Sequence, residues 1–214
     1  MPSRQFLNLP AEKQEEILRA SLREFAQHGY NGASTNRIVE DARISKGVLF
    51  KYFEDKESLF MYVVDRALQT YTDAFPTRDV LSYDSPFEWM KDVTLRKLRF
   101  SKERPLTYQL LMRIAKEPAH PVYAKAMGRI ARASEQYLAQ VAAWLPNDGL
   151  RDGLTWKHVF ALVNWITQGM VDQYVARLPE VVDEDFESAF ELVHADLDLY
   201  LDIIRRGVYK EEGP

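Results

Sequence analysis

The stretch from Ser34 to Phe60, STNRIVEDARISKGVLFKYFEDKESLF, constrains the fold of this chain more than any other. Two short helical patterns in it join across Arg43-Ile44, a connection too short for anything but a tight turn. In the first pattern, apolar residues recur at the spacing of one helix face. Ser45 is suited to cap the next helix, because its hydroxyl can accept from an early backbone N–H. The stretch therefore predicts a helix-turn-helix.

The second short helix, about Ser45 to Tyr52, has the size and composition of a helix that reads DNA. Val48 or Leu49 faces inward, which leaves lysines and a glycine near the outer side. A two-turn helix of this kind fits a major groove that is roughly 12 Å wide. We therefore expect the chain to bind double-stranded DNA through Thr35, Asn36, Arg37, Lys46, Gly47, Lys51, Tyr52 and Lys56.

These candidates divide by the chemistry of their side chains. Hydroxyl and ammonium groups suit phosphate, and they are offered by Thr35, Tyr52 and Lys56. Asparagine pairs well with adenine and lysine with guanine, so base edges are assigned to Asn36, Lys46 and Lys51. Gly47 would let the backbone approach the duplex closely. The alternative interpretation is an ordinary solvated face on a small helical bundle.

The same stretch resembles the N-terminal domain of the TetR family of bacterial one-component repressors. The resemblance rests on an ordered set of residues: Ser34, Thr35, Ile38, Ala42, Ile44-Ser45-Lys46-Gly47, Leu49, Phe50, Tyr52, Phe53, Lys56, Leu59 and Phe60. Two positions depart from the family pattern. Arg43 stands where the turn usually has Gly, so a positive φ there would be strained. Phe50 stands where the family commonly has a Tyr whose hydroxyl touches phosphate.

The rest of the chain is predicted to be helical. Helices are expected over about 10–29, 56–75, 86–102, 105–116, 120–145, 155–178 and 184–206, with breaks at proline and glycine. The expected fold class is all-α, with an N-terminal three-helix helix-turn-helix domain, a larger C-terminal helical bundle and about nine helices in total. We place the DNA-binding domain at 1–54 and an effector-binding and dimerisation domain at 55–214, linked by the helix that begins at Lys56. Phe6 and Leu7 are expected to fold back over the N-terminal core.

Composition excludes several classes of protein. The chain has no cysteine, which rules out disulfides and thiolate metal sites and fits a cytoplasmic location. No signal peptide is expected, and no apolar run approaches the ~20 residues of a membrane span. Residues 1–53 carry a net charge of +2 and the remainder −6, as a DNA-reading domain on an acidic body would. The sequence contains neither a Gly-rich phosphate-binding loop nor an HExxH motif, and its four histidines do not have the spacing of metal ligands. We therefore expect no enzymatic activity, no bound metal and no cofactor.

The last predicted helix carries two apolar stripes. Phe186, Phe190, Val193, Leu197, Tyr200 and Ile204 are spaced 4, 3, 4, 3, 4, as in a coiled-coil seam. Ala189, Leu192, Leu199 and Ile203 form the second stripe. One stripe would face the chain's own body and the other a second copy, although packing within one chain remains the alternative. We assign the dimer surface to Trp165, Met170, Phe190, Val193, Leu197, Tyr200 and Ile204.

The resemblance to the TetR family implies a homodimer through the last two helices and an effector pocket among helices 86–178. The pocket candidates are Trp89, Phe100, Tyr108, Met112, Tyr123, Met127, Trp165, Gln168 and Asp172, which would suit a small apolar or aromatic effector. The expected function is a ligand-responsive repressor that binds a palindromic operator and is released by its effector. The alternatives are an all-α carrier or enzyme with a vestigial DNA-binding domain, a non-specific DNA binder, and an activator with the same operator geometry.

Overall fold

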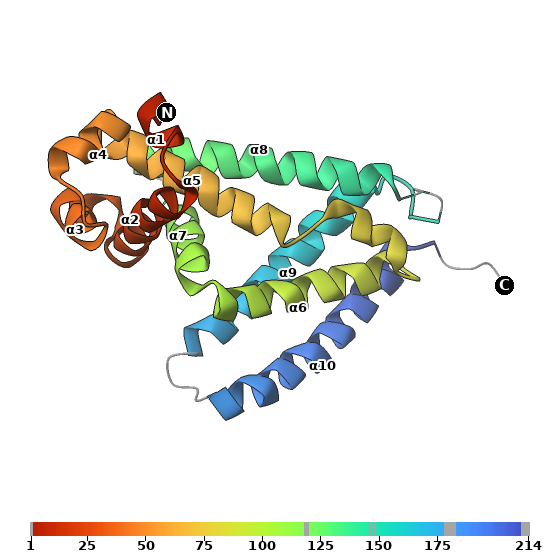
Figure 1. Cartoon of the computed structure of the whole chain (residues 1–214). Coiled ribbons are helices and arrows are strands. Elements are labelled where there is room, and N and C mark those ends of the chain that lie inside the picture. Colours follow the sequence, from red (N-terminus) through yellow and green to blue (C-terminus); the bar gives the residue numbers. More distant parts are fainter. Residues whose placement is uncertain (1, 118–119, 146, 148, 178–182, 211–214) are drawn as a thin grey trace. The chain divides into compact units, whose positions relative to one another are not determined.

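The computed structural model describes residues 2–117, 120–145, 147, 149–177 and 183–210 of the 214-residue chain. Its described part contains ten α-helices and one short 3-10 helix (Figure 1). Apart from these there is an isolated antiparallel bridge between Leu150 and Tyr209. The predicted all-α fold class is confirmed. The helix count exceeds nine because one extra turn of helix precedes the first predicted one.

The helices follow one another closely along the chain. Their bounds are α1 (Arg4–Leu7), α2 (Ala11–Gly32), α3 (Thr35–Asp41), α4 (Lys46–Tyr52), α5 (Lys56–Asp73), η1 (Thr77–Ser82), α6 (Pro86–Glu103), α7 (Pro105–Lys116), α8 (Pro121–Ala143), α9 (Trp156–Arg177) and α10 (Asp183–Val208). Side-chain caps fix several of the N-termini. Ser34 caps α3, Ser45 accepts from the Val48 N–H at 3.3 Å, and Asp55 accepts from the Ser58 N–H at 2.7 Å. These caps supply partners for backbone donors that the first turn leaves open.

The helices gather into two compact units. Unit 1 comprises Met1–Ala74 and Glu103–Ala133, and unit 2 comprises Phe75–Lys102 and Ser134–Pro214. Helix α7 and the first part of α8 therefore belong with the helix-turn-helix, although α5, η1 and α6 separate them from it along the chain. The boundary that we placed at residue 54 was meant to separate the DNA-binding part from the effector-binding part, and it does not follow the compact units. It remains a prediction.

Unit 1 is built around an aromatic core. Phe25, Phe53 and Phe60 are fully buried, and α7 packs along α2 and α5. The short helix α1 closes the core at the end of α4, because the ring of Phe6 lies 4.9 Å from that of Phe53 and is completely buried. Leu7, which we expected to fold back with Phe6, is instead 53% exposed. Neighbouring residues on a helix point about 100° apart, so one turn cannot bury both.

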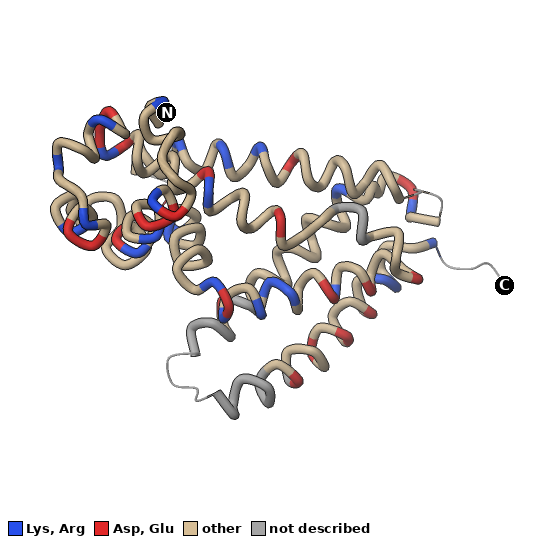
Figure 2. Tube along the Cα trace, viewed as in Figure 1, with Lys and Arg blue, Asp and Glu red and all other residues tan. Residues whose placement is uncertain are grey.

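Unit 2 consists of α6, the end of α8, α9 and α10. The ring of Trp89 on α6 packs against Phe160 of α9 and Tyr137 of α8, with centroids 5.9 and 6.4 Å apart. An ion pair of 2.6 Å joins Lys91 to Asp198, where basic residues along α6 accompany acidic residues along α10 (Figure 2). Across the described residues, we find no helix with the length and apolar character that crossing a membrane requires.

Candidate nucleic-acid interface

The turn between α3 and α4 has the geometry that the sequence predicted. Ile38 and Leu49 are buried and join the two helices to the core of unit 1. Arg43 has a φ of 51°, a left-handed conformation that is uncommon at a non-glycine residue, at the position where the family pattern usually has Gly. Lys13 of α2 donates to the Ala42 carbonyl at 2.9 Å and so holds the turn from the core side. The helix-turn-helix is therefore joined to the core of unit 1 by apolar packing and by a hydrogen bond.

Helix α4 presents one face to the core and the other to solvent. Leu49 is buried, while Val48 and Tyr52 are half-buried. The solvent face is formed by Lys46, Gly47, Phe50 and Lys51, all of them exposed. A Cβ added at Gly47 would meet nothing within 4 Å. The face that would meet DNA is therefore open and flanked by lysines.

Three of the predicted DNA contacts remain available for a ligand. The side chains of Asn36, Lys46 and Lys51 are exposed and make no hydrogen bond or ion pair with a described residue. Thr35, at the first position of α3, is half-buried. The structure brings these residues together on α3 and α4, but their contact with DNA stays a prediction.

Two further candidates also make contacts within unit 1. Tyr52 is half-buried, with its ring 5.8 Å from that of Phe6. The Lys56 ammonium lies 4.9 Å from the centroid of the Tyr30 ring and donates to the Asn31 carbonyl at 3.4 Å. Burial lowers the pKa of Lys56. Any phosphate contact by Lys56 would therefore be made from a position held against α2.

Arg37 differs from the other candidates because its guanidinium, although about half exposed, forms an ion pair with a buried carboxylate of unit 1. Its Nε donates to Glu24 Oε1 at 2.9 Å, and its Nη2 donates to the Gly32 carbonyl, also at 2.9 Å. Glu24 is 7% exposed and also accepts from the Ser34 N–H at 2.7 Å. Arg37 is thus a residue that positions the start of α3, and its guanidinium is already engaged by this pair.

Replacing Glu24 with glutamine is expected to destabilise unit 1 by about 1–3 kcal/mol at pH 7, because it removes a charge-assisted bond from a buried acceptor. The effect should lie in the lower half of this range, since the Arg37 side chain is about half exposed and solvent screens the pair. Urea unfolding of the two proteins measures the difference. Glu15→Gln, at an exposed acid on the same helix, is the matched control and should change little.

The difference between wild type and Glu24→Gln should also depend on pH. Burial raises the pKa of Glu24, but the hydrogen bonds from Arg37 and the Ser34 N–H, with the nearby charges of Arg37 and His28, leave it below its ordinary value of 4.5. The stabilisation is therefore complete above about pH 4.5 and is lost as the pH falls through the lowered pKa. A difference in the free energy of unfolding between the two proteins that stays constant from pH 7 to pH 3 would contradict this assignment.

The corner between α7 and α8 is bonded to the end of α2. The Tyr123 hydroxyl accepts from the Tyr30 N–H at 2.7 Å, and Arg113 donates to the Ala26 carbonyl at 3.3 Å. Gly29 has a φ of 65°, and a Cβ there would lie 3.0 Å from the Tyr123 hydroxyl oxygen. Further along α8, Lys125 pairs with Glu57 and Arg129 with Asp65, both on α5. Helix α8 is thus attached to the two helices that support the helix-turn-helix.

The nine predicted pocket residues divide between the two units. Tyr108, Met112, Tyr123 and Met127 belong to unit 1, and Trp89, Phe100, Trp165, Gln168 and Asp172 belong to unit 2. Within unit 2, the Gln168 amide donates to Asp172 at 3.0 Å. The assignment of Trp165 to a pocket is corrected, because 72% of its surface is exposed. Among the described residues, no group of three acidic or histidine side chains could hold a metal ion.

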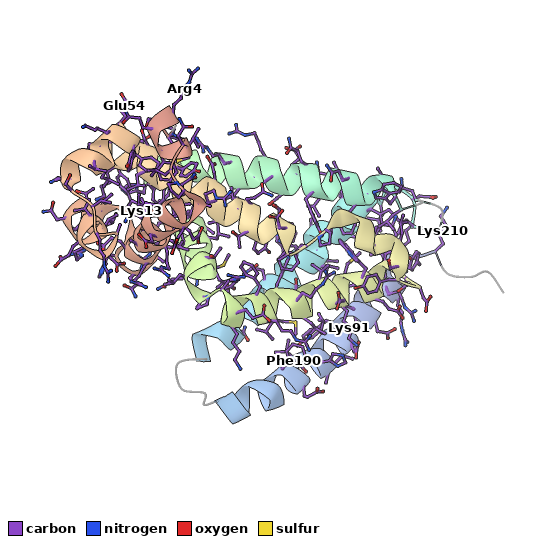
Figure 3. All side chains as sticks on the ribbon, in the orientation of Figure 1. Arg4, Lys13, Glu54, Lys91, Phe190 and Lys210 are labelled. Atoms are coloured by element: carbon purple, nitrogen blue, oxygen red, sulfur yellow. The ribbon has the colours of Figure 1, made fainter. Side chains whose placement is uncertain are left out.

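The predicted dimer surface is also corrected in part. Four seam residues are buried inside a single chain and present no surface to a second one: Phe190, Val193, Leu197 and Ile204. Figure 3 labels Phe190 on α10 and Lys91 on α6, and the Arg99 guanidinium of α6 lies 4.7 Å from the Phe190 ring centroid. Met170 is half-buried. The exposed large apolar residues of α9 and α10, which we call the outer apolar face, are Leu162, Trp165, Leu199, Tyr200 and Ile203.

Sequence reasoning missed Glu24, although a signal was present. Glu24 stands seven residues after Ile17 and three after Ser21, on the stripe of α2 that is otherwise apolar or small. A carboxylate is almost never buried without a partner. An acidic residue on a buried stripe therefore predicts a cation nearby, and Arg37 fills that role.

Comparison with known proteins agrees with this geometry. Residues 17–63 match the model of a family described as bacterial regulatory proteins, tetR family. The HTH-type transcriptional repressor AcnR of Corynebacterium diphtheriae is 35% identical over 81 residues, which are 38% of this chain and 40% of that protein. The match thus spans less than half the length of this relative.

Comparison with solved structures shows that the similarity in fold covers nearly the whole chain. A TetR family transcriptional regulator from Chloroflexus aurantiacus superposes with a TM-score of 0.70 at 24% identity, covering 99% of this chain and 100% of the other. The regulator FadR of Bacillus subtilis, in complex with stearoyl-CoA, gives 0.62 at 14% identity, with 84% and 96% covered. The helix-turn-helix, the family model and the shared fold lead to one conclusion: the N-terminal part of this chain matches the tetR family of bacterial regulatory proteins, and the chain has the fold of the solved TetR family regulators.

Proposed function

We propose that this protein is a ligand-responsive transcriptional repressor that binds a palindromic operator as a homodimer. The observation that carries the proposal is the solvent face of α4, where exposed lysines flank an open glycine on a helix whose opposite face is packed on the core of unit 1. Such a face suits the major groove, and phosphate neutralisation by lysine supplies much of the affinity. The relative AcnR is itself named a transcriptional repressor.

The homodimer is supported by the outer apolar face. Exposed large apolar side chains on two helices that contact each other are typical of a protein–protein interface. Trp165 and Ile203 are 72% and 59% exposed in the single chain, so water would surround them without a partner. A two-fold dimer would present two copies of α4 to a palindromic operator, about 34 Å apart.

Release by an effector is proposed to act through α8. This helix holds α2 and α5 through Tyr123, Lys125 and Arg129, and it continues to Ala143, within unit 2. An effector that binds one conformation of unit 2 more tightly would change the position of α8 against α2 and α5, and with it the position of α4. That FadR of the same fold was solved with stearoyl-CoA gives a precedent for a ligand in this architecture.

Footprinting of the purified protein on fragments of its source genome tests the proposal. We expect a short palindromic footprint whose affinity falls steeply between two salt concentrations, because each phosphate neutralised releases counterions. Addition of the effector, sought among compounds related to the neighbouring genes, should abolish the footprint.

Gly47→Glu is the matched control for this experiment. Its side chain would enter open space, so the fold should persist while a carboxylate faces the phosphates. The variant should lose the footprint and keep the wild-type melting temperature. A folded wild-type dimer that gives no discrete footprint at either salt concentration would contradict the proposal.

A further inference from the structure

Phe50 is an exposed aromatic residue on the helix that is proposed to read DNA. Its side chain is 39% exposed, whereas the other aromatic residues of α1 to α5 are buried or half-buried. Its ring makes no aromatic contact with a described residue. A single exposed apolar residue is ordinary on a protein surface. Phe50 is unusual because it is exposed on the face of α4 that is proposed to meet DNA.

Phe50 lies in the middle of the solvent face of α4. Successive residues of an α-helix are about 100° apart, so Lys46, Phe50, Gly47 and Lys51 follow one another, in that order, over about 140°. The two lysines stand at the edges and the ring stands beside Gly47 near the centre. Because nothing occupies the space above Gly47, a base edge could approach the backbone next to the ring.

The chemistry of this arrangement favours one contact. A phenyl ring carries no hydrogen-bonding group, so it serves neither the phosphates nor the polar atoms of a base edge. The apolar feature that the major groove offers is the 5-methyl group of thymine. Lysines at the edges of the face suit the phosphate chains on either side of the groove.

We propose that Phe50 determines sequence specificity by packing on the methyl group of one thymine in each operator half-site. This inference rests on the proposed function, since it requires α4 to enter the major groove. Under this proposal the base contact is made by Phe50 near the centre of the solvent face. Lys46 and Lys51, which we first assigned to base edges, would instead bind the phosphates of the DNA backbone. The operator then requires thymine at a fixed position in both half-sites.

Single replacement of thymine by deoxyuridine in the operator tests the contact, because it removes only the methyl group. Binding of the full-length protein is measured by fluorescence anisotropy for wild type, Phe50→Ala and Phe50→Tyr. At one position, uracil should weaken wild-type binding about fourfold, and about sixteenfold when both half-sites are changed, as expected for one buried methyl group each. Phe50→Ala should bind the two operators equally, whereas Phe50→Tyr keeps the ring and the discrimination.

Lys51→Ala is the control, because loss of a phosphate contact should weaken both operators equally and reduce the salt dependence. The same thymine-to-uracil ratio in wild type and Phe50→Ala at every position would overturn the inference. If that unchanged ratio came with an affinity that Phe50→Ala lowers by the same factor on both operators, the ring would be assigned to deoxyribose. A wild-type protein that forms no discrete footprint would overturn the proposed function instead.

Discussion

Substitution of Ile203 by aspartate is expected to convert the proposed dimer to monomers and to weaken operator binding at least about a hundredfold. Ile203 lies on the outer apolar face and is 59% exposed in the single chain, so the substitution should leave the fold intact. In a dimer the carboxylate would be buried among apolar side chains without a cation, which is strongly unfavourable. Each monomer would then reach only one half-site, and the gain from linking two binding events would be lost.

Sedimentation velocity and anisotropy on the same samples measure the two effects. Leu81→Asp is a matched control, since Leu81 is 60% exposed on η1 and lies outside the outer apolar face. That variant should remain dimeric and bind DNA as wild type does. An Ile203→Asp protein that sediments as a dimer would show that the outer apolar face is not the subunit interface.

Truncation of Phe6 to alanine is expected to destabilise unit 1 by about 3–5 kcal/mol, the usual range for a large buried aromatic residue. Its ring is fully buried and lies 4.9 Å from Phe53 and 5.5 Å from Tyr62. Its loss would leave a cavity between α1, α4 and α5. Because the Ser3 N–H donates to the Tyr52 carbonyl at 2.8 Å, loosening of α1 would also reach the end of the recognition helix.

The neighbouring residue provides the control for this second experiment. Leu7→Ala removes a side chain of similar character that is 53% exposed, and it should change the free energy of unfolding by no more than about 0.5 kcal/mol. Urea unfolding with circular dichroism measures both variants. A Phe6→Ala protein that is within about 1 kcal/mol of wild type would show that α1 is not part of the cooperative core.

The parts of the fold that the sequence predicted are those encoded locally. The turn at Arg43 and the cap at Ser45 each depend on residues a few positions apart, and both occur as expected. The bond of Arg37 to Glu24 joins positions 13 residues apart, and the bond of Tyr123 to Tyr30 joins positions 93 apart. The position of Glu24 on a buried stripe indicates that a cation lies nearby, but no periodicity in one helix specifies the residue that it meets in another, so neither partner could be identified from the sequence.

The two apolar stripes of α10 show that the sequence of one helix also does not predict which of its faces is buried. Both are apolar at helical spacing, and the regular seam with Phe190 and Leu197 was the more conspicuous pattern. The structure buries four residues of that seam within the chain, Phe190, Val193, Leu197 and Ile204, and leaves Leu199 and Ile203 exposed together with Tyr200 of the seam. Which stripe turns inward depends on the shape of α6 and α9 beside it, and no count along α10 contains that information.

The discontinuous make-up of unit 1 limits how this protein can be synthesised and recombined. A ribosome that has released α1 to α5 has made a DNA-binding unit still lacking Leu110, Ile114 and Tyr123, all buried in its core. The apolar surface that they cover stays in contact with water until residue 133 has emerged, although domains otherwise tend to fold from the N-terminus as they appear. A chimera that exchanges DNA-binding specificity between regulators of this kind must therefore transplant α7 and the first half of α8 together with the helix-turn-helix.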